Sequence, residues 1–256
     1  MMRLDPRSLV PRALLACGLL TTLALPARAT VPVAFGTSWD PPGTALQNVV
    51  DARYGTGTID AATDYIGAHP ADPDPFYWTG LGFTSYLVEE VASNRNRNIL
   101  GWYIESGSMP VIDGVDDGIV FTGPHAPGFT TSVTLPTGLR PFGFYMNPNG
   151  TEGTQNAPEP ELFFTNRLYN DRGPDGSGAV HAPFDGDVQA VVYDVSRFTR
   201  PFTWLVCFED LDSGPNPGAC CTGTDNDFND FVFQVTALGA TPVVPMTFGQ
   251  LKARYR

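Results

Sequence analysis

The chain has 256 residues and is acidic, with 27 Asp and Glu against 15 Lys and Arg and a formal net charge of −12. This balance excludes nucleic acid and anionic membrane surfaces as expected partners, because both are bound through Lys and Arg that neutralise phosphate. The 27 Gly and 24 Pro favour short strands joined by tight turns.

The N-terminal 29 residues are typical of an export signal. Three arginines precede an apolar run over residues 13–25, and residues 27–29 read Ala-Arg-Ala, a small-x-small cleavage pattern. We expect cleavage near Ala29, a secreted or cell-surface protein, and no membrane span in the mature chain, since the run is short for one. A lipoprotein signal around Cys17 competes, but Arg12 leaves almost no apolar stretch before it.

Two segments flank the main fold that we expect. Residues 30–79 are interpreted as an N-terminal extension packed on it, and TALQNVVDARYG (44–55) predicts a helix capped by Thr44 and ended by Gly55. Residues 239–256 are basic and lack acids, and we interpret them as a tail with a possible sorting or attachment signal.

Residues 80–238 carry a series of candidate strands with alternating apolar residues, separated by turn clusters such as NPNGTEG. Their ranges are 83–92, 99–105, 118–123, 129–136, 140–146, 161–166, 188–195, 202–210 and 230–237. Large apolar residues share one face in two of them, at positions 202, 204, 206 and 208 and at positions 231, 233 and 235. The pattern predicts an all-β fold, an antiparallel β-sandwich of jelly-roll type.

Three cysteines follow the export signal: Cys207, Cys220 and Cys221. In an exported protein an odd count indicates one disulfide and one remaining thiol. A bond from Cys207 to Cys220 or Cys221 would close the loop between two strands, and we favour such a bond, although the sequence does not give the pairing.

The stretch CFEDLDSGPNPGACCTGTDNDFNDFVFQV (207–235) gathers carboxylates between two apolar strands. Antiparallel pairing of 201–208 with 231–236 would bring both acidic flanks to the same end of the sandwich. Two carboxylates about 4 Å apart repel by about 4 kcal/mol at an effective dielectric of about 20, so the cluster needs a cation or solvent. Oxygen donors without histidine favour Ca²⁺ over zinc or copper, and a set of about six to eight oxygens favours it over Mg²⁺.

The string DNDFND (225–230) begins like an EF-hand calcium loop and then departs from it. Asp230 stands where Gly is required, Thr236 stands where the bidentate Glu belongs, and the following FVFQV is strand-like. In an extended strand, neighbouring residues would point to opposite faces. We therefore expect a bend near Asp227 and a strand that begins at about Asp230.

The strings FEDL (208–211) and DNDFND, followed by an apolar strand, resemble the terminal motif of a bacterial domain of unknown function, number 4114. LVEEVASNRNRNILGWYI, RPFGFYM and FFTNRLYNDRGPDG resemble earlier parts of that domain, so the resemblance covers about residues 80–237. It implies a secreted or surface-anchored, adhesin-like β-sandwich that binds calcium and has no established catalysis. The insertion PNPGACCTGT departs from the family pattern and leaves two alternatives to the ligand set: Asp212 joins it, or Glu209 turns away from it. The metal ligands that the resemblance implies are Glu209, Asp210, Asp225, Asp227, Asn229 and Asp230.

We expect a binding protein and not an enzyme: a secreted or cell-surface calcium-binding module with a structural or adhesive role, whose partner is an extracellular protein or glycan. Calcium would order the loop 209–230. The alternative function is a carbohydrate-binding module with structural calcium, in which exposed aromatic side chains contact the sugar. Packing in the core is the simpler interpretation of the candidate aromatics. These aromatics are Trp39, Tyr77, Trp78 and Trp102.

Other polar features carry weaker hypotheses. A solvated turn is the competing interpretation of the acidic loop, because Asp suits turns. The string DGVDDG (113–118) is expected to be an exposed turn and not a second metal site. A glycan-active enzyme is the least favoured function, since sequence spacing cannot set the separation of paired acids and no histidine lies in a catalytic motif. The residues concerned are the pairs Glu89/Glu90 and Glu159/Glu161 and the histidines His69, His125 and His181.

Overall fold

The structure is a computed structural model, and it describes residues 33, 35–36, 40–69, 72–73, 76–92, 97–123, 125–136, 138–148, 162–170, 188–210 and 225–239. Within these ranges the fold is almost entirely β. The elements are α1 (Leu46–Tyr54), β1 (Trp78–Gly80), β2 (Gly82–Glu89), β3 (Ile99–Ile104), β4 (Asp117–Thr122), β5 (Thr130–Thr134), β6 (Arg140–Asn147), β7 (Phe163–Phe164), the 3-10 helix η1 (Arg167–Tyr169), β8 (Ala190–Asp194), β9 (Thr203–Phe208) and β10 (Phe231–Leu238).

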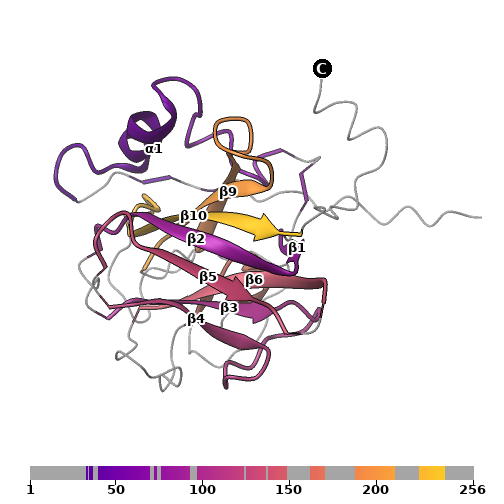
Figure 1. Ribbon diagram of the computed structural model, residues 1–256. Helices are drawn as coiled ribbons and strands as arrows, with labels where there is room; N and C mark the ends of the chain where they lie inside the picture. The colour runs from indigo at the N-terminus through magenta and orange to yellow at the C-terminus, as the bar shows by residue number, and fades with distance from the viewer. Residues whose placement is uncertain are drawn as a thin grey trace, which may run out of the picture.

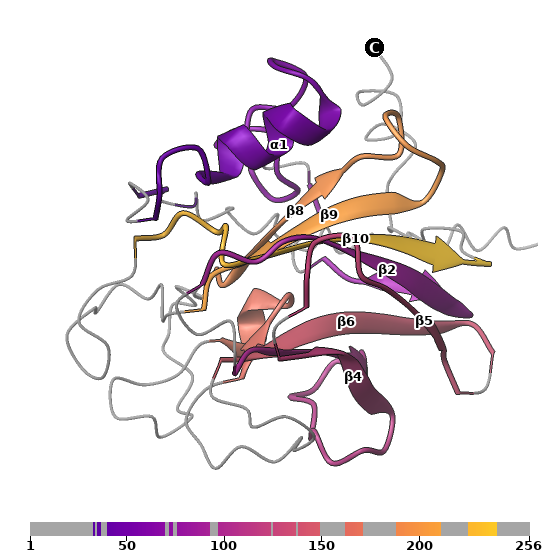
Figure 2. The ribbon, with the colours of Figure 1, turned by 60° about the vertical axis from the view of Figure 1, so that its left-hand side comes forward.

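The strands form two five-stranded antiparallel sheets that face each other. The first sheet has the order β1-β6-β3-β4, with β7 paired to β6, and the second has the order β5-β2-β10-β9-β8. Figures 1 and 2 show the two sheets as stacked layers, with α1 on the far side of the second sheet. The predicted all-β antiparallel sandwich is confirmed.

Aromatic and aliphatic side chains from both sheets fill the space between them. Trp204, Val206 and Phe208 of β9 and Phe233 and Val235 of β10 all belong to this main core, as their alternation predicts. Phe144 of the first sheet and Phe233 of the second meet edge to face, with ring centroids 5.1 Å apart. The core therefore fixes the register of β9 against β10, and with it the positions of the residues directly after β9 and before β10.

The outer face of the second sheet is covered at β8, β9 and β10 by the segment before β1. Leu46 and Val50 of α1 pack in one cluster with Leu205 of β9 and Val232 of β10. The backbone N–H of Ile66 donates to the carbonyl of Val192 at 2.8 Å. β9 is consequently buried along both faces, which accounts for its nearly continuous apolar sequence.

The helix lies where the sequence predicts it, but its cap differs. Ala45 is the N-cap residue and gives no side-chain cap, while the Thr44 hydroxyl donates to the carbonyl of Pro41 at 2.6 Å. The prediction that Thr44 caps the helix is wrong, since its hydroxyl closes the turn before the helix. Gly55 ends the helix as predicted, with φ of 100°.

The nine ranges expected as strands all contain strands, within a few residues of the expected ends. β1 was missed because its sequence, WTG, is too short for an alternating pattern. Two glycine–tyrosine pairs join β3 to β6: Gly101 lies opposite Tyr145, and Tyr103 lies opposite Gly143. Each tyrosine lies across the glycine opposite, since a Cβ on Gly101 would be 2.1 Å from the Tyr145 ring.

Several sequence-based expectations fall outside the described residues. They are the export signal over 1–29, the tail beyond Gly239, Cys220, Cys221, Asp212, Trp39, His181, Glu159 and Glu161. Within the described part of the chain, no helix is long and apolar enough to cross a membrane.

Candidate metal centre

The candidate metal ligands sit where β9 ends and β10 begins. Phe208, the last residue of β9, pairs with Phe231, the first residue of β10, so the residues after one and before the other meet. Glu209 is 0% exposed and Asp210 3% exposed, directly after β9. Asp230, directly before β10, is 7% exposed. The antiparallel pairing predicted from the sequence is confirmed, and it buries the carboxylates of both flanks.

The backbone before β10 is bent in the way that the ligand hypothesis requires. Asn226 has φ of 49° and Phe228 φ of 55°, so left-handed residues flank Asp227 on both sides. The strand begins at Phe231. The segment 225–230 is therefore not extended, and the predicted bend near Asp227 is confirmed.

Three of the predicted ligands converge in one buried group, Glu209, Asp210 and Asp230, whose carboxylate oxygens lie within 4.8 Å of one another. The backbone N–H of Asp210 donates to Oδ2 of Asp230 at 2.8 Å, which ties the two flanks together. Burial raises the pKa of Asp230 well above its ordinary value, and the neighbouring Glu209 and Asp210 raise it further. Without a cation, this group favours uptake of a proton.

The second group contains a residue that sequence reasoning missed. Asp225 and Asp227 lie with Asp40, and the ligand oxygens of the three fall within 4.8 Å of one another. Asp40 belongs to the segment before α1, far from the acidic loop in sequence. In the sequence, Asp40 is a single acid before a Pro-Pro-Gly turn, and no pattern links that turn to the acidic loop.

Asn229 anchors the acidic segment to the chain before α1. Its side chain is fully buried, and Nδ2 donates to the carbonyl of Thr44 at 2.9 Å. Its side chain also hydrogen-bonds Asp40. The backbone N–H of Asn229 donates to Oδ1 of Asp227 at 3.2 Å. Asn229 therefore belongs with the second group, and the six predicted ligands divide between two groups.

The same segment crosses the acidic loop once more at Gly36. The N–H of Gly36 donates to the carbonyl of Asn226 at 3.0 Å, and a Cβ on Gly36 would be 1.7 Å from the carbonyl oxygen of Asp225. Phe35 packs edge-on against Phe228 with ring centroids 5.3 Å apart. We call residues 33–44 the strap, because the described part of this segment lies against the acidic loop.

Cys207 does not join a disulfide. Its thiol is free and fully buried among the apolar residues of the outer cluster, next to α1. Burial raises the pKa of this thiol well above its ordinary value. The expectation of a bond from Cys207 is wrong because Cys207 points to the outer face of β9, opposite to Phe208.

The DGVDDG string forms a hydrogen-bonded turn that is exposed over residues 113–116, as expected, whereas Asp117 is 7% exposed. Oδ2 of Asp117 accepts the backbone N–H groups of Asp113 at 3.0 Å and Gly114 at 2.9 Å. Asp116 forms a 3.8 Å ion pair with Arg140. Within the described residues, these acids do not gather with a third ligand.

The aromatic and histidine candidates lie apart from the acidic groups. Trp78 is 2% exposed and Trp102 7% exposed, so both are core residues, while Tyr77 is 37% exposed. His125 stacks on Phe129 with ring centroids 3.9 Å apart. These positions give neither an exposed aromatic pair nor a catalytic arrangement among the described candidates.

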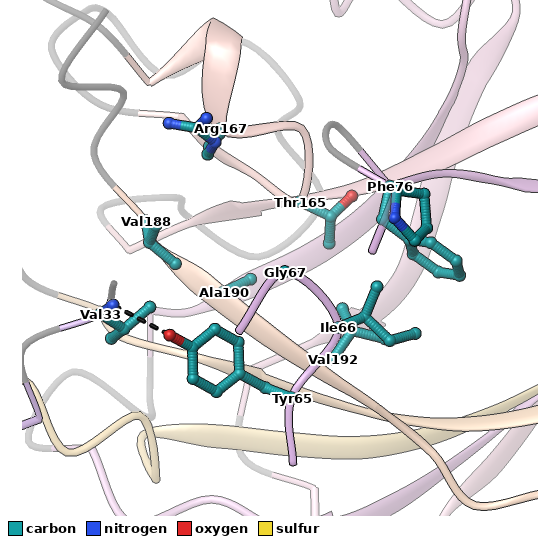
Figure 3. Close-up of a pocket in the computed structure, with 11 residues that line it drawn as sticks. Val33, Tyr65, Ile66, Gly67, Phe76, Thr165, Arg167, Val188, Ala190 and Val192 are labelled. Atoms are coloured by element: carbon teal, nitrogen blue, oxygen red, sulfur yellow. Dashed lines mark hydrogen bonds between the residues drawn. The ribbon is translucent and has the colours of Figure 1, made fainter. Parts of the chain in front are cut away.

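A small pocket lies where the extension meets the edge strand β8 (Figure 3). Tyr65 and Ile66 line it from the extension, and Ala190 and Val192 from β8. The N–H of Val33 donates to the Tyr65 hydroxyl at 3.0 Å. Its volume of about 50 Å³ is far below that of ligand pockets, so we interpret it as a packing gap.

Comparison with protein families adds one match. Residues 136–237 match the model of a domain of unknown function, DUF4114. This part of the chain is similar to the DUF4114 family. The resemblance stated from the sequence is confirmed for this range, which contains all six predicted ligands but neither Asp40 nor strands β1 to β5. No match was found among curated proteins or among solved structures.

The DUF4114 range accounts for only part of the sandwich. Its last strand, β10, pairs with β2, and its first strand, β6, pairs with β1 and β3. The partner strands all lie before residue 136. The DUF4114 segment therefore shares both sheets and the main core with residues outside the match.

Proposed function

We propose that this protein is a secreted or cell-surface calcium-binding β-sandwich with a structural, adhesive role toward an extracellular protein or glycan. Calcium orders the loop 209–230 and holds the strap against the sandwich. In this proposal the ligands are Glu209, Asp210, Asp225, Asp227, Asn229 and Asp230, and Asp40 of the strap joins them.

The observation that carries the proposal is the convergence of buried carboxylates at the junction of β9 and β10. Glu209, Asp210 and Asp230 are each more than nine-tenths buried and lie within 4.8 Å of one another. Repulsion of this kind is worth about 4 kcal/mol for a pair at about 4 Å, so a solvated turn does not explain the arrangement. A divalent cation offsets the charge, and carboxylate and amide oxygens are the donors that Ca²⁺ prefers.

Calcium binding is tested by two independent measurements. Isothermal titration of chelator-treated protein with Ca²⁺ measures binding, and thermal unfolding with and without Ca²⁺ measures stabilisation. We expect saturable binding in the range of about 10⁻⁴–10⁻³ M that is common for extracellular modules, and a melting temperature that rises with calcium. Mg²⁺ at the same concentration should stabilise less.

A pair of isosteric substitutions that remove charge identifies the site. Asp227→Asn with Asp230→Asn keeps the shape of both side chains and removes one carboxylate from each group; this variant should lose the calcium-dependent rise. Asp113→Asn, in the DGVDDG turn, removes one charge at a distance and should behave like the unchanged protein. An equal calcium response in all three proteins would refute the proposed site.

A further inference from the structure

A second acidic feature lies on the first sheet, apart from the candidate metal centre. Glu105 directly follows β3 and is 7% exposed. Its Oε1 accepts the backbone N–H of Gly107 at 2.7 Å and the hydroxyl of Tyr169 at 2.5 Å. Its Oε2 accepts Nδ2 of Asn166 at 3.0 Å. Three neutral donors thus hold the carboxylate in one orientation.

The supporting residues are themselves fixed. Asn166 is the N-cap residue of η1, and its Oδ1 accepts the N–H of Leu168 at 3.1 Å, which leaves Nδ2 to face Glu105. Tyr169 packs edge-on against Tyr103 with ring centroids 6.0 Å apart. Burial and the neighbouring Glu105 raise the pKa of Tyr169, so its phenol is a neutral donor at physiological pH.

Glu105 and its partners Gly107, Asn166 and Tyr169 line a pocket of about 380 Å³. Tyr77, 37% exposed, lies at this pocket together with Ser106, Pro141 and Leu168. The volume falls within the usual range for ligand pockets of about 300–1,000 Å³. It also far exceeds the space needed by one or two water molecules.

The pocket contains negative charge without a cationic partner. Among the described residues, no Lys, Arg or His forms an ion pair with Glu105. Buried carboxylates are normally paired with a cation, because hydrogen bonds from neutral donors leave the net charge in place. The net charge of −12 on the whole chain adds to the attraction for positive ligands.

We propose that this pocket binds an organic cation, an alkylammonium or guanidinium group, with Glu105 as its counter-charge and Tyr77 as an aromatic contact. Oε2 has accepted one hydrogen bond and has a lone pair left for a donor on the ligand. An aromatic ring beside a cation adds attraction through its π face. One carboxylate supplies too few oxygens for Ca²⁺, and a neutral sugar would leave the buried charge unpaired.

Binding is tested on the full mature chain in saturating calcium, with titrations followed by calorimetry and by amide NMR shifts. The probes are N-acetyl-lysinamide and N-acetyl-argininamide, and methyl glucoside is the neutral comparison. We expect both cations to bind, the glycoside not to bind, and the affinity to fall with added salt because the attraction is electrostatic.

Substitutions distinguish cation binding in the pocket from general electrostatic attraction of cations to an acidic protein. Glu105→Gln should weaken cation binding by about tenfold or more, the loss of one charge-assisted contact. Tyr77→Leu should weaken it a few-fold, and Tyr77 is exposed enough to be replaced without loss of the fold. Glu89→Gln, on β2 of the other sheet, removes the same charge and should leave binding unchanged.

Each outcome decides the proposal. Cation binding that Glu105→Gln or Tyr77→Leu weakens, and that Glu89→Gln does not, supports it; if Glu105→Gln fails to fold, Tyr77→Leu and the salt dependence carry the test. Binding of the glycoside alone, equal binding by all variants, or no cation binding at millimolar concentrations overturns it. Tighter binding of a lysine-containing peptide than of N-acetyl-lysinamide indicates a basic residue of a protein partner, and equal binding indicates a small amine.

Discussion

The Asp230 side chain links stability to both pH and calcium. Its pKa is raised in the folded protein, chiefly by burial and then by Glu209 and Asp210. A raised carboxyl pKa means that the folded state holds a proton that the unfolded state has released. Stability from this group is therefore complete below the unfolded pKa near 4 and is lost as the pH rises through the folded value.

We expect chelator-treated protein to melt at a lower temperature at pH 7 than at pH 5. Calcium should reduce or reverse this difference, because the cation replaces the proton that Asp230 would otherwise hold. Melting temperatures at several pH values, with chelator and with calcium, measure the effect, and Asp230→Asn should flatten the pH dependence of the metal-free protein. A metal-free protein that gains stability from pH 5 to pH 7 would contradict this account.

Asp40 provides a second prediction at the level of one residue. Because Asp40 lies with Asp225 and Asp227, Asp40→Asn should lower calcium affinity by about tenfold, equivalent to about 1.4 kcal/mol. The metal-free protein should lose little stability, since one repelling charge is removed. Asp60→Asn is the matched control, because Asp60 is an exposed acid of the same extension and its Oδ1 accepts only a local N–H, that of Ala62. Calorimetric titrations of the two variants make the comparison.

The residues of the candidate site show what sequence can predict. Glu209, Asp210 and Asp230 were predictable because they directly adjoin two strands whose alternation fixes their pairing. Asp40 was not, because its proximity to Asp227 depends on how the strap lies against the acidic loop. The buried position of Glu105 was missed for a similar reason: its partners, Asn166 and Tyr169, follow β7, and no local pattern joins them to β3.

At the level of elements, the pairing of β3 with β6 depends on glycines that make room for tyrosines. Gly101 does not have a positive φ, so alanine is allowed there by the backbone, but its Cβ would overlap the Tyr145 ring. We expect Gly101→Ala to destabilise the protein by about 1–3 kcal/mol, as overpacking does. Urea unfolding of Gly101→Ala, Tyr145→Ala and the double variant tests the cause. If the clash is responsible, the double variant costs less than the sum of the single ones.

β9 gives another prediction, because Cys207 is free and fully buried. A thiol reagent should label Cys207 only after unfolding, and a reductant should leave the melting temperature unchanged. The measurement uses a chain in which the other cysteines are replaced by serine, beside the unchanged protein. Loss of about 3 kcal/mol on reduction of the unchanged protein would indicate a disulfide that closes the loop.

For the whole molecule, the strands were predictable from period-two alternation, but their distribution between the sheets was not. β1 pairs with β6 and β2 with β10, and such long-range partners leave no mark in a local pattern. The sequence predicted an extension packed on the sandwich. It did not predict that α1 and the residues around it cover the outer face of β8, β9 and β10 and share a core with Leu205 and Val232.

The strap connects this cover to the candidate metal centre, so calcium should control how firmly it is held. The strap touches the acidic loop at four points: Phe35 on the Phe228 ring, Gly36 on the Asn226 carbonyl, Thr44 on the Asn229 side chain, and Asp40 among the acids. If calcium neutralises those acids, its removal restores repulsion between Asp40 and Asp225 and weakens the contact. In chelator we therefore expect faster proteolytic cleavage within residues 33–44 and faster hydrogen exchange there, while the amides of β3 and β6 stay protected.

Gly36→Ala should give the same fast cleavage even with calcium, since its Cβ would overlap the Asp225 carbonyl, a backbone group that cannot rotate away. Equal cleavage of the unchanged protein with calcium and with chelator would show that the strap is held by packing alone.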